Sequence, residues 1–67
     1  MLELKVDKRL TVWVDPSHIV SVEMDVPPNA AQMALIIHMD NNACVSIRGE
    51  SAVWEAVNVL KAAGVIK

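Results

Sequence analysis

The chain has 67 residues, a formal net charge of −2 and a hydrophobic content of 54%. Its six lysines and arginines are too few to line a face for nucleic-acid phosphates, and no apolar run approaches the roughly 20 residues of a membrane-spanning helix. We therefore expect no nucleic-acid partner and no membrane insertion. The single cysteine allows no internal disulfide, and the N-terminal residues lack the apolar segment of a signal peptide, so we expect a cytoplasmic protein.

Residues 1–67 are few enough to form a single domain, and a chain of this size buries only about 60% of its unfolded surface. Small domains of this kind usually gain stability from disulfides, a metal ion or a partner chain. The hydrophobic content exceeds what a small core can hide, and exposed apolar patches usually mark interfaces. We therefore expect a protein partner, a homo-oligomer or both, and no cofactor.

Three stretches near the N-terminus alternate hydrophobic with polar residues, which is typical of strands with one buried face. They cover residues 1–6, 10–14 and 18–26, and a proline-containing break at residues 15–17 separates the second from the third. The residues predicted to face inward are Leu2, Leu4, Val6, Leu10, Val12, Val14, Val20, Val22, Met24 and Val26.

Residues 33–48 predict two further strands joined by a turn, and two pairing registers fit that turn. The two-residue loop Asn41-Asn42 turns His38 toward the buried face. The three-residue loop 40–42 places His38 opposite Cys44 on the other face. We favour the three-residue loop, because it puts the strongly apolar residues on one buried face. Those residues are Leu35, Ile37, Met39, Val45 and Ile47.

The C-terminal part predicts one helix over residues 52–63, with Ser51 as its N-cap and Gly64 after its end. Apolar residues recur at helical spacing at Val53, Val57 and Leu60 and predict the buried stripe. The fold class that follows is α+β: a small antiparallel sheet of about five strands packed against one C-terminal helix.

His38 and Cys44 are the candidate residues for chemistry, because a cysteine–histidine pair can act as nucleophile and base or bind zinc. The sequence offers no third group for catalysis, no glycine-rich loop for an oxyanion and no zinc-ligand spacing. We therefore predict no catalytic, cofactor-binding or metal-binding residues. An enzyme or metal protein using His38 and Cys44 remains an alternative.

The residues predicted to bind a partner are hydrophobic side chains that the patterns place outside the buried faces. Tryptophan is enriched at interface hot spots, and Trp13 and Trp54 are the only aromatic residues of the chain. Ile19 and Ile36 lie on the outward face of their predicted strands. The predicted partner-binding set is Trp13, Ile19, Ile36 and Trp54.

The order of elements resembles that of the small flagellar and swarming-motility proteins of the FlbD type. The residues that carry the resemblance are Asp15-Pro16, Ile19, Val22, Glu23, Glu50, Ser51, Val53 and Val57. The resemblance implies a non-enzymatic accessory role. We therefore expect a non-catalytic protein-binding or oligomerising module of a bacterium or bacteriophage, which occupies its partner through an apolar sheet face or an edge strand. The alternative within this class is a phage-encoded inhibitor of a host protein or defence system.

Overall fold

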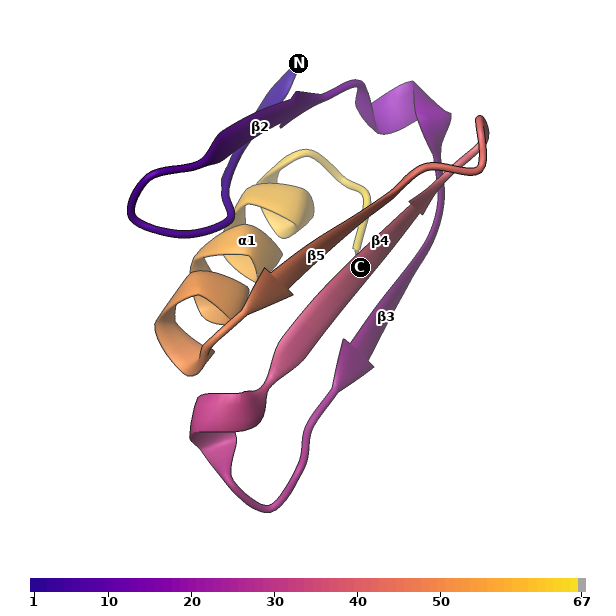
Figure 1. The fold of residues 1–67 in the computed structure, drawn as a ribbon. Coiled ribbons are helices and arrows are strands. Elements are labelled where there is room, and N and C mark those ends of the chain that lie inside the picture. Colours follow the sequence, from indigo (N-terminus) through magenta and orange to yellow (C-terminus); the bar gives the residue numbers. More distant parts are fainter. Residues whose placement is uncertain (67) are drawn as a thin grey trace.

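The computed structural model describes residues 1–66, which form five strands and one C-terminal α-helix (Figure 1). The predicted α+β fold is confirmed. The elements are β1 (Leu2–Lys5), β2 (Thr11–Val14), the short 3₁₀ helix Pro16–His18, β3 (Ile19–Asp25), the short 3₁₀ helix Ala30–Gln32, β4 (Ala34–Met39), β5 (Cys44–Arg48) and α1 (Glu50–Ala62).

The strands divide into two antiparallel sheets. β1 pairs with β2, and the second sheet has the order β3-β4-β5. Between them, the Asp15 carboxylate accepts a hydrogen bond from the backbone N–H of Ser17 at 3.0 Å and caps the 3₁₀ helix. Proline has no N–H to donate to a ladder and its φ is fixed, so Pro16 ends the first sheet and redirects the chain.

The first hairpin confirms most of its predicted alternation. Leu4 is fully buried and Val14 is 2% exposed, whereas Trp13 points outward. The inward prediction for Leu10 is wrong, because its side chain is 51% exposed. The Asp7 carboxylate accepts hydrogen bonds from the backbone N–H groups of Arg9 and Leu10 and so keeps Leu10 in the turn.

β3 contains a β-bulge that the alternation did not predict. The pairing steps from Ile19 opposite Met39 to Ser21 opposite His38, which leaves Val20 unpaired. The predicted faces of two residues are therefore wrong: Val20 is 67% exposed, and Ile19 packs against the core. A strict alternation of faces does not allow for the extra residue of a bulge. It therefore predicted Val20 to face inward and Ile19 to face outward, the reverse of what the structure shows.

The hairpin between β4 and β5 has the favoured three-residue loop. Leu35 lies opposite Ile47, and His38 lies opposite Cys44. The N–H of Met39 donates to the carbonyl of Ala43 at 2.9 Å and closes the loop. Asn42 has a φ of 67°, in the left-handed region that asparagine tolerates better than most residues. Turn chemistry and apolar pairing thus favour the same register.

The helix starts two residues earlier than predicted. It begins at Glu50, with Gly49 at the N-cap position and no capping side chain, so the predicted capping role of Ser51 is wrong. Gly49 has a φ of 98°, a conformation that strongly favours glycine. Its N–H donates to the carbonyl of Met33 at 2.9 Å and ties the start of α1 to the start of β4.

The C-terminal end of α1 confirms the prediction for Gly64, which follows the C-cap and has a φ of 80°. The N–H of Val65 donates to the carbonyl of Leu60 at 2.9 Å, and the N–H of Gly64 donates to that of Lys61 at 3.0 Å. These two bonds form a Schellman motif, which directs Val65 back against the core.

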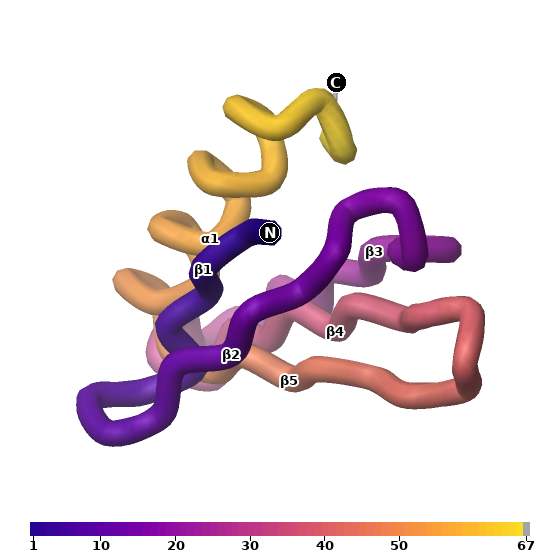
Figure 2. The backbone as a smooth tube through the Cα atoms, turned by 90° about the horizontal axis from the view of Figure 1, so that it is seen from above, coloured from indigo at the N-terminus to yellow at the C-terminus, as the bar shows by residue number. Residues whose placement is uncertain are grey.

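The hydrophobic core lies between the sheets and α1. The helix makes its main strand contacts, within the described chain, with β1, β5 and β4. Figure 2 shows β1 beside α1 and β3 on the opposite side of the molecule. The buried residues are Leu4, Val14, Met33, Leu35, Ile37, Ile47, Val53, Ala56, Val57 and Leu60.

Candidate protein-interaction surface

The inward-facing hydrophobic side chains of β3 are only partly buried. Val22 and Met24 pair with Ile37 and Leu35, which are fully buried on β4. Val22 is only half-buried, Met24 is 39% exposed, and Val26, two residues further on, is 64% exposed. The alternation correctly predicted which way Val22 and Met24 face, whereas the inward prediction for Val26 is wrong, because β3 ends before it and its side chain is mostly exposed. Their exposure follows from the position of α1, which packs on other strands.

Trp54 lies on an exposed flank of α1. It is 47% exposed, and the helical period places it about 100° from the buried Val53. Glu55 and Val59, on the other flank of the helix, line a groove of about 390 Å³ against β1. Trp54 therefore lies on the flank of α1 that points away from β1.

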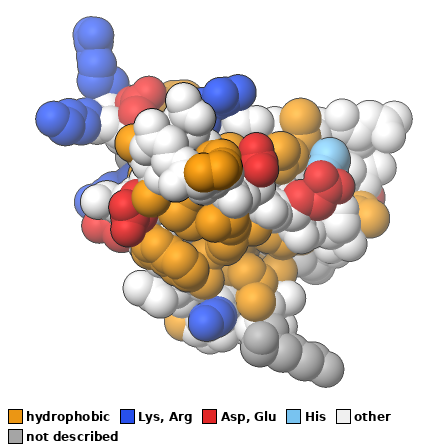
Figure 3. All heavy atoms as spheres, turned by 90° about the horizontal axis from the view of Figure 1, so that it is seen from below, with side chains coloured by type: hydrophobic (Ala, Val, Ile, Leu, Met, Phe, Trp, Pro, Cys, Tyr) orange, Lys and Arg blue, Asp and Glu red, His pale blue; other side chains and the backbone are white. Residues whose placement is uncertain are grey.

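We define the β3–α1 face by Val22, Met24, Val26 and Trp54. Figure 3 shows a face of the molecule on which hydrophobic side chains gather in the middle, with charged side chains around them. Single exposed apolar residues are common on protein surfaces, whereas a contiguous group with a polar margin is typical of an interaction site.

The outer side of β3 is acidic. Glu23 and Asp25 alternate with Val22 and Met24, and both carboxylates are exposed. Glu23 Oε1 lies 3.2 Å from His38 Nε2, and within residues 1–66 no ion pair includes Asp25. One side of this edge strand is therefore apolar and the other carries negative charge.

The structure brings a third residue to the candidate pair His38 and Cys44. Glu23 contacts His38 Nε2, and the exposed Cys44 lies opposite His38 across the hairpin. No local pattern in the sequence indicates the contact between Glu23 and His38, because the two residues are 15 positions apart in the chain. The pairing of β3 with β4 brings them together. Within the described chain, no group of three or more histidine, cysteine, aspartate or glutamate residues is placed to hold a metal ion.

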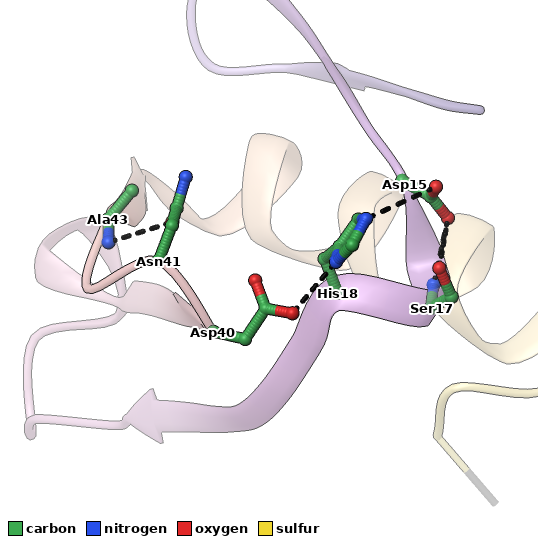
Figure 4. A network of polar contacts seen from close by, with 6 residues as sticks. All are labelled: Asp15, Ser17, His18, Asp40, Asn41 and Ala43. Carbon is green, nitrogen blue, oxygen red and sulfur yellow. Dashed lines mark hydrogen bonds and ion pairs between the residues drawn. The ribbon is translucent and has the colours of Figure 1, made fainter.

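A second polar cluster joins the two sheets at the tip of the β4–β5 hairpin (Figure 4). His18 Nδ1 lies 2.8 Å from Asp40 Oδ2, and the N–H of Asp40 donates to the carbonyl of His18 at 2.9 Å. The hydrogen bond to Asp40 raises the pKa of His18, and the hydrogen bond from the Ser17 hydroxyl lowers the pKa of Asp15. No spacing in the sequence indicated the contact between His18 and Asp40.

The four predicted partner-binding residues do not form one surface. Trp13 is 59% exposed on β2, where it borders a depression of about 340 Å³ together with Met1 and His18. Ile36 is half-buried on the outer face of the second sheet, and the bulge brings Ile19 against the core. Trp54 alone belongs to the β3–α1 face.

Comparisons with known protein families, with curated proteins and with solved structures find no match to this chain. Within residues 1–66, the helix is neither long nor apolar enough to span a membrane. The interpretation of the β3–α1 face therefore rests on the residues themselves.

Proposed function

We propose that this chain is a small, non-catalytic protein-binding module that works by occupying a partner through the β3–α1 face. The observation that carries the proposal is the exposure of Met24, which faces inward on β3, together with that of the neighbouring Val26. An alternation of hydrophobic and polar residues is typical of a strand with one buried face. Among residues 1–66, no segment fully covers this part of that face, so a partner would complete its burial.

The composition of the chain supports the same proposal. Over half of its residues are hydrophobic, and its ten-residue buried core leaves seven large hydrophobic side chains exposed. Three of these seven, Met24, Val26 and Trp54, belong to the β3–α1 face. We propose a cytoplasmic protein of a bacterium or bacteriophage, with the accessory role that the FlbD-type resemblance implies. A phage-encoded inhibitor of a host protein would use the same face in the same way.

A photo-crosslinking amino acid at position 26 tests the proposal in cells that carry the gene. Val26 is exposed at one end of the proposed contact, so irradiation should give a protein adduct of higher mass. The matched control is the same amino acid at Ala43, which is exposed at the tip of the β4–β5 hairpin. The double change Met24→Ser with Trp54→Ala should remove the adduct from position 26.

Two results would contradict the proposal: equal adducts from positions 26 and 43, or no adduct from position 26. Mass spectrometry of the adduct then separates a homo-oligomer, which would have twice the mass of the chain, from a complex with another protein. Met24 and Trp54 are 39% and 47% exposed, so each contributes to stability through its buried part. A melting curve of the double variant therefore provides the control for folding.

A further inference from the structure

We infer that the occupant of the β3–α1 face is an extended segment of another protein, with basic residues at alternate positions and apolar residues between them. This inference rests on the proposed function and names how the partner is recognised. The segment pairs with the open edge of β3 as an added strand, one of the recurring modes of peptide recognition.

The hydrogen-bond pattern identifies the free backbone groups of β3. The N–H of Met39 donates to the carbonyl of Ala43, directly before β5, and residues of an antiparallel ladder bond to alternate sides. Ile36 of β4 therefore bonds toward β3, where its partner is Glu23. It follows that Val22 and Met24 direct their N–H and C=O groups away from β4, toward an edge that no strand occupies.

The open edge adjoins the partly buried hydrophobic side chains of β3, and this combination distinguishes β3 from β5. Val22 and Met24 carry the free backbone groups and also project their side chains into the β3–α1 face. β5 has an open edge too, but α1 packs on it and Ile47 is fully buried. A strand added to β3 would gain backbone hydrogen bonds and bury apolar side chains beside Trp54.

The negative charge on the outer side of β3 favours basic residues on the same side of the added strand. Glu23 and Asp25 project from the outer side of β3 at positions i and i+2. Residues of an added strand alternate with the same period, so two basic residues separated by one apolar residue would face both carboxylates. An acidic segment would place like charges opposite each other, which destabilises the pairing.

A second copy of this chain does not fit these requirements. In antiparallel self-pairing, a register that joins Val22 to Met24 sets Glu23 opposite Glu23 of the copy. A register that joins Met24 to Met24 sets Glu23 opposite Asp25. Joining Val22 to Val22 brings Met24 to the bulged Val20, where the ladder is interrupted. No two of the chain's basic residues are two positions apart: they are Lys5, Lys8, Arg9, Arg48, Lys61 and Lys67.

Blocked synthetic peptides test the inference directly on the isolated chain. The probe is the five-residue peptide Lys-Val-Lys-Val-Lys, and the controls are Glu-Val-Glu-Val-Glu and the rearranged Lys-Lys-Lys-Val-Val. Amide chemical shifts, followed by NMR during titration, should change at Val22 and Met24 with the first peptide. Its affinity should exceed that of either control by about tenfold, as two exposed ion pairs allow.

Variants of the chain separate strand pairing from simple charge attraction. The double change Glu23→Lys with Asp25→Lys should reverse the preference toward the glutamate peptide. The matched control, Glu50→Lys with Glu55→Lys, makes the same change of net charge on α1. This variant should still prefer the alternating lysine peptide. Met24→Pro removes an N–H that the sheet does not use and should abolish binding, whereas Met24→Ile retains that N–H and should keep binding.

Equal binding of the two lysine peptides, or binding that survives Met24→Pro, would overturn the inference. The crosslink from position 26 distinguishes a failure of the proposed function from a failure of the added-strand inference. An adduct with another protein that is unchanged by the lysine changes at Glu23 and Asp25 would leave the proposed function standing and refute the added strand. An adduct of twice the chain mass would refute the heterologous partner.

Discussion

The same substitution at two valines tests whether the β3–α1 face is uncovered. Val14 is 2% exposed and Val26 is 64% exposed. Full burial of a valine contributes about 1.5 kcal/mol or more to the free energy of unfolding, so Val26 retains about a third of that, near 0.5 kcal/mol. At Val14, Val→Thr removes a methyl group and buries a hydroxyl, which should cost about 2 kcal/mol or more. At Val26 the cost should stay below about 0.5 kcal/mol.

Urea denaturation followed by circular dichroism measures both changes. A domain of this length is stable by about 3–10 kcal/mol, so a loss of 2 kcal/mol shifts the midpoint clearly. Because both variants make the same Val→Thr change, the difference between their unfolding free energies reports mainly the difference in burial of the two positions. A loss at Val26 equal to that at Val14 would mean that the isolated chain already buries this position, and the argument for a covering partner would fail.

Three further predictions concern the local structures that frame the site. The hydrogen bond that His18 donates to Asp40 raises the pKa of His18 above its ordinary value of 6.5. The contact therefore stabilises the fold below pH 6.5, and this stability is lost as the pH rises through the folded-state pKa. Asp40→Asn should flatten that part of the curve of unfolding free energy between pH 5 and 8, and an unchanged curve would contradict the contact. Ser51→Ala should change the unfolding free energy by less than about 0.5 kcal/mol, because a true N-cap serine would lose about 1 kcal/mol. Asn42→Val should cost about 1–2 kcal/mol in thermal or urea unfolding, whereas Asn42→Gly should not, since a β-branched residue is disfavoured at positive φ.

Several residues of the candidate surface were visible in the sequence, but their exposure was not. Alternation predicted that Val22, Met24 and Val26 share one face, and Trp54 was predicted to bind a partner. Periodicity identifies the face of a strand without indicating what lies against that face. The partner-binding prediction for Ile19 failed for a related reason, since a bulge changes the period within a single strand.

The sequence by itself determined the strands, the helix, the register of the β4–β5 hairpin and the end of α1 at Gly64. These features depend on residues close together in the chain, where apolar periodicity and turn chemistry act directly. Only the tertiary structure decided the division into two sheets, the contact of Glu23 with His38 and the uncovered state of β3. The last of these follows from the direction in which Gly49 starts the helix, which sets the strands that α1 covers. Such placement depends on packing between distant segments, which no local pattern records.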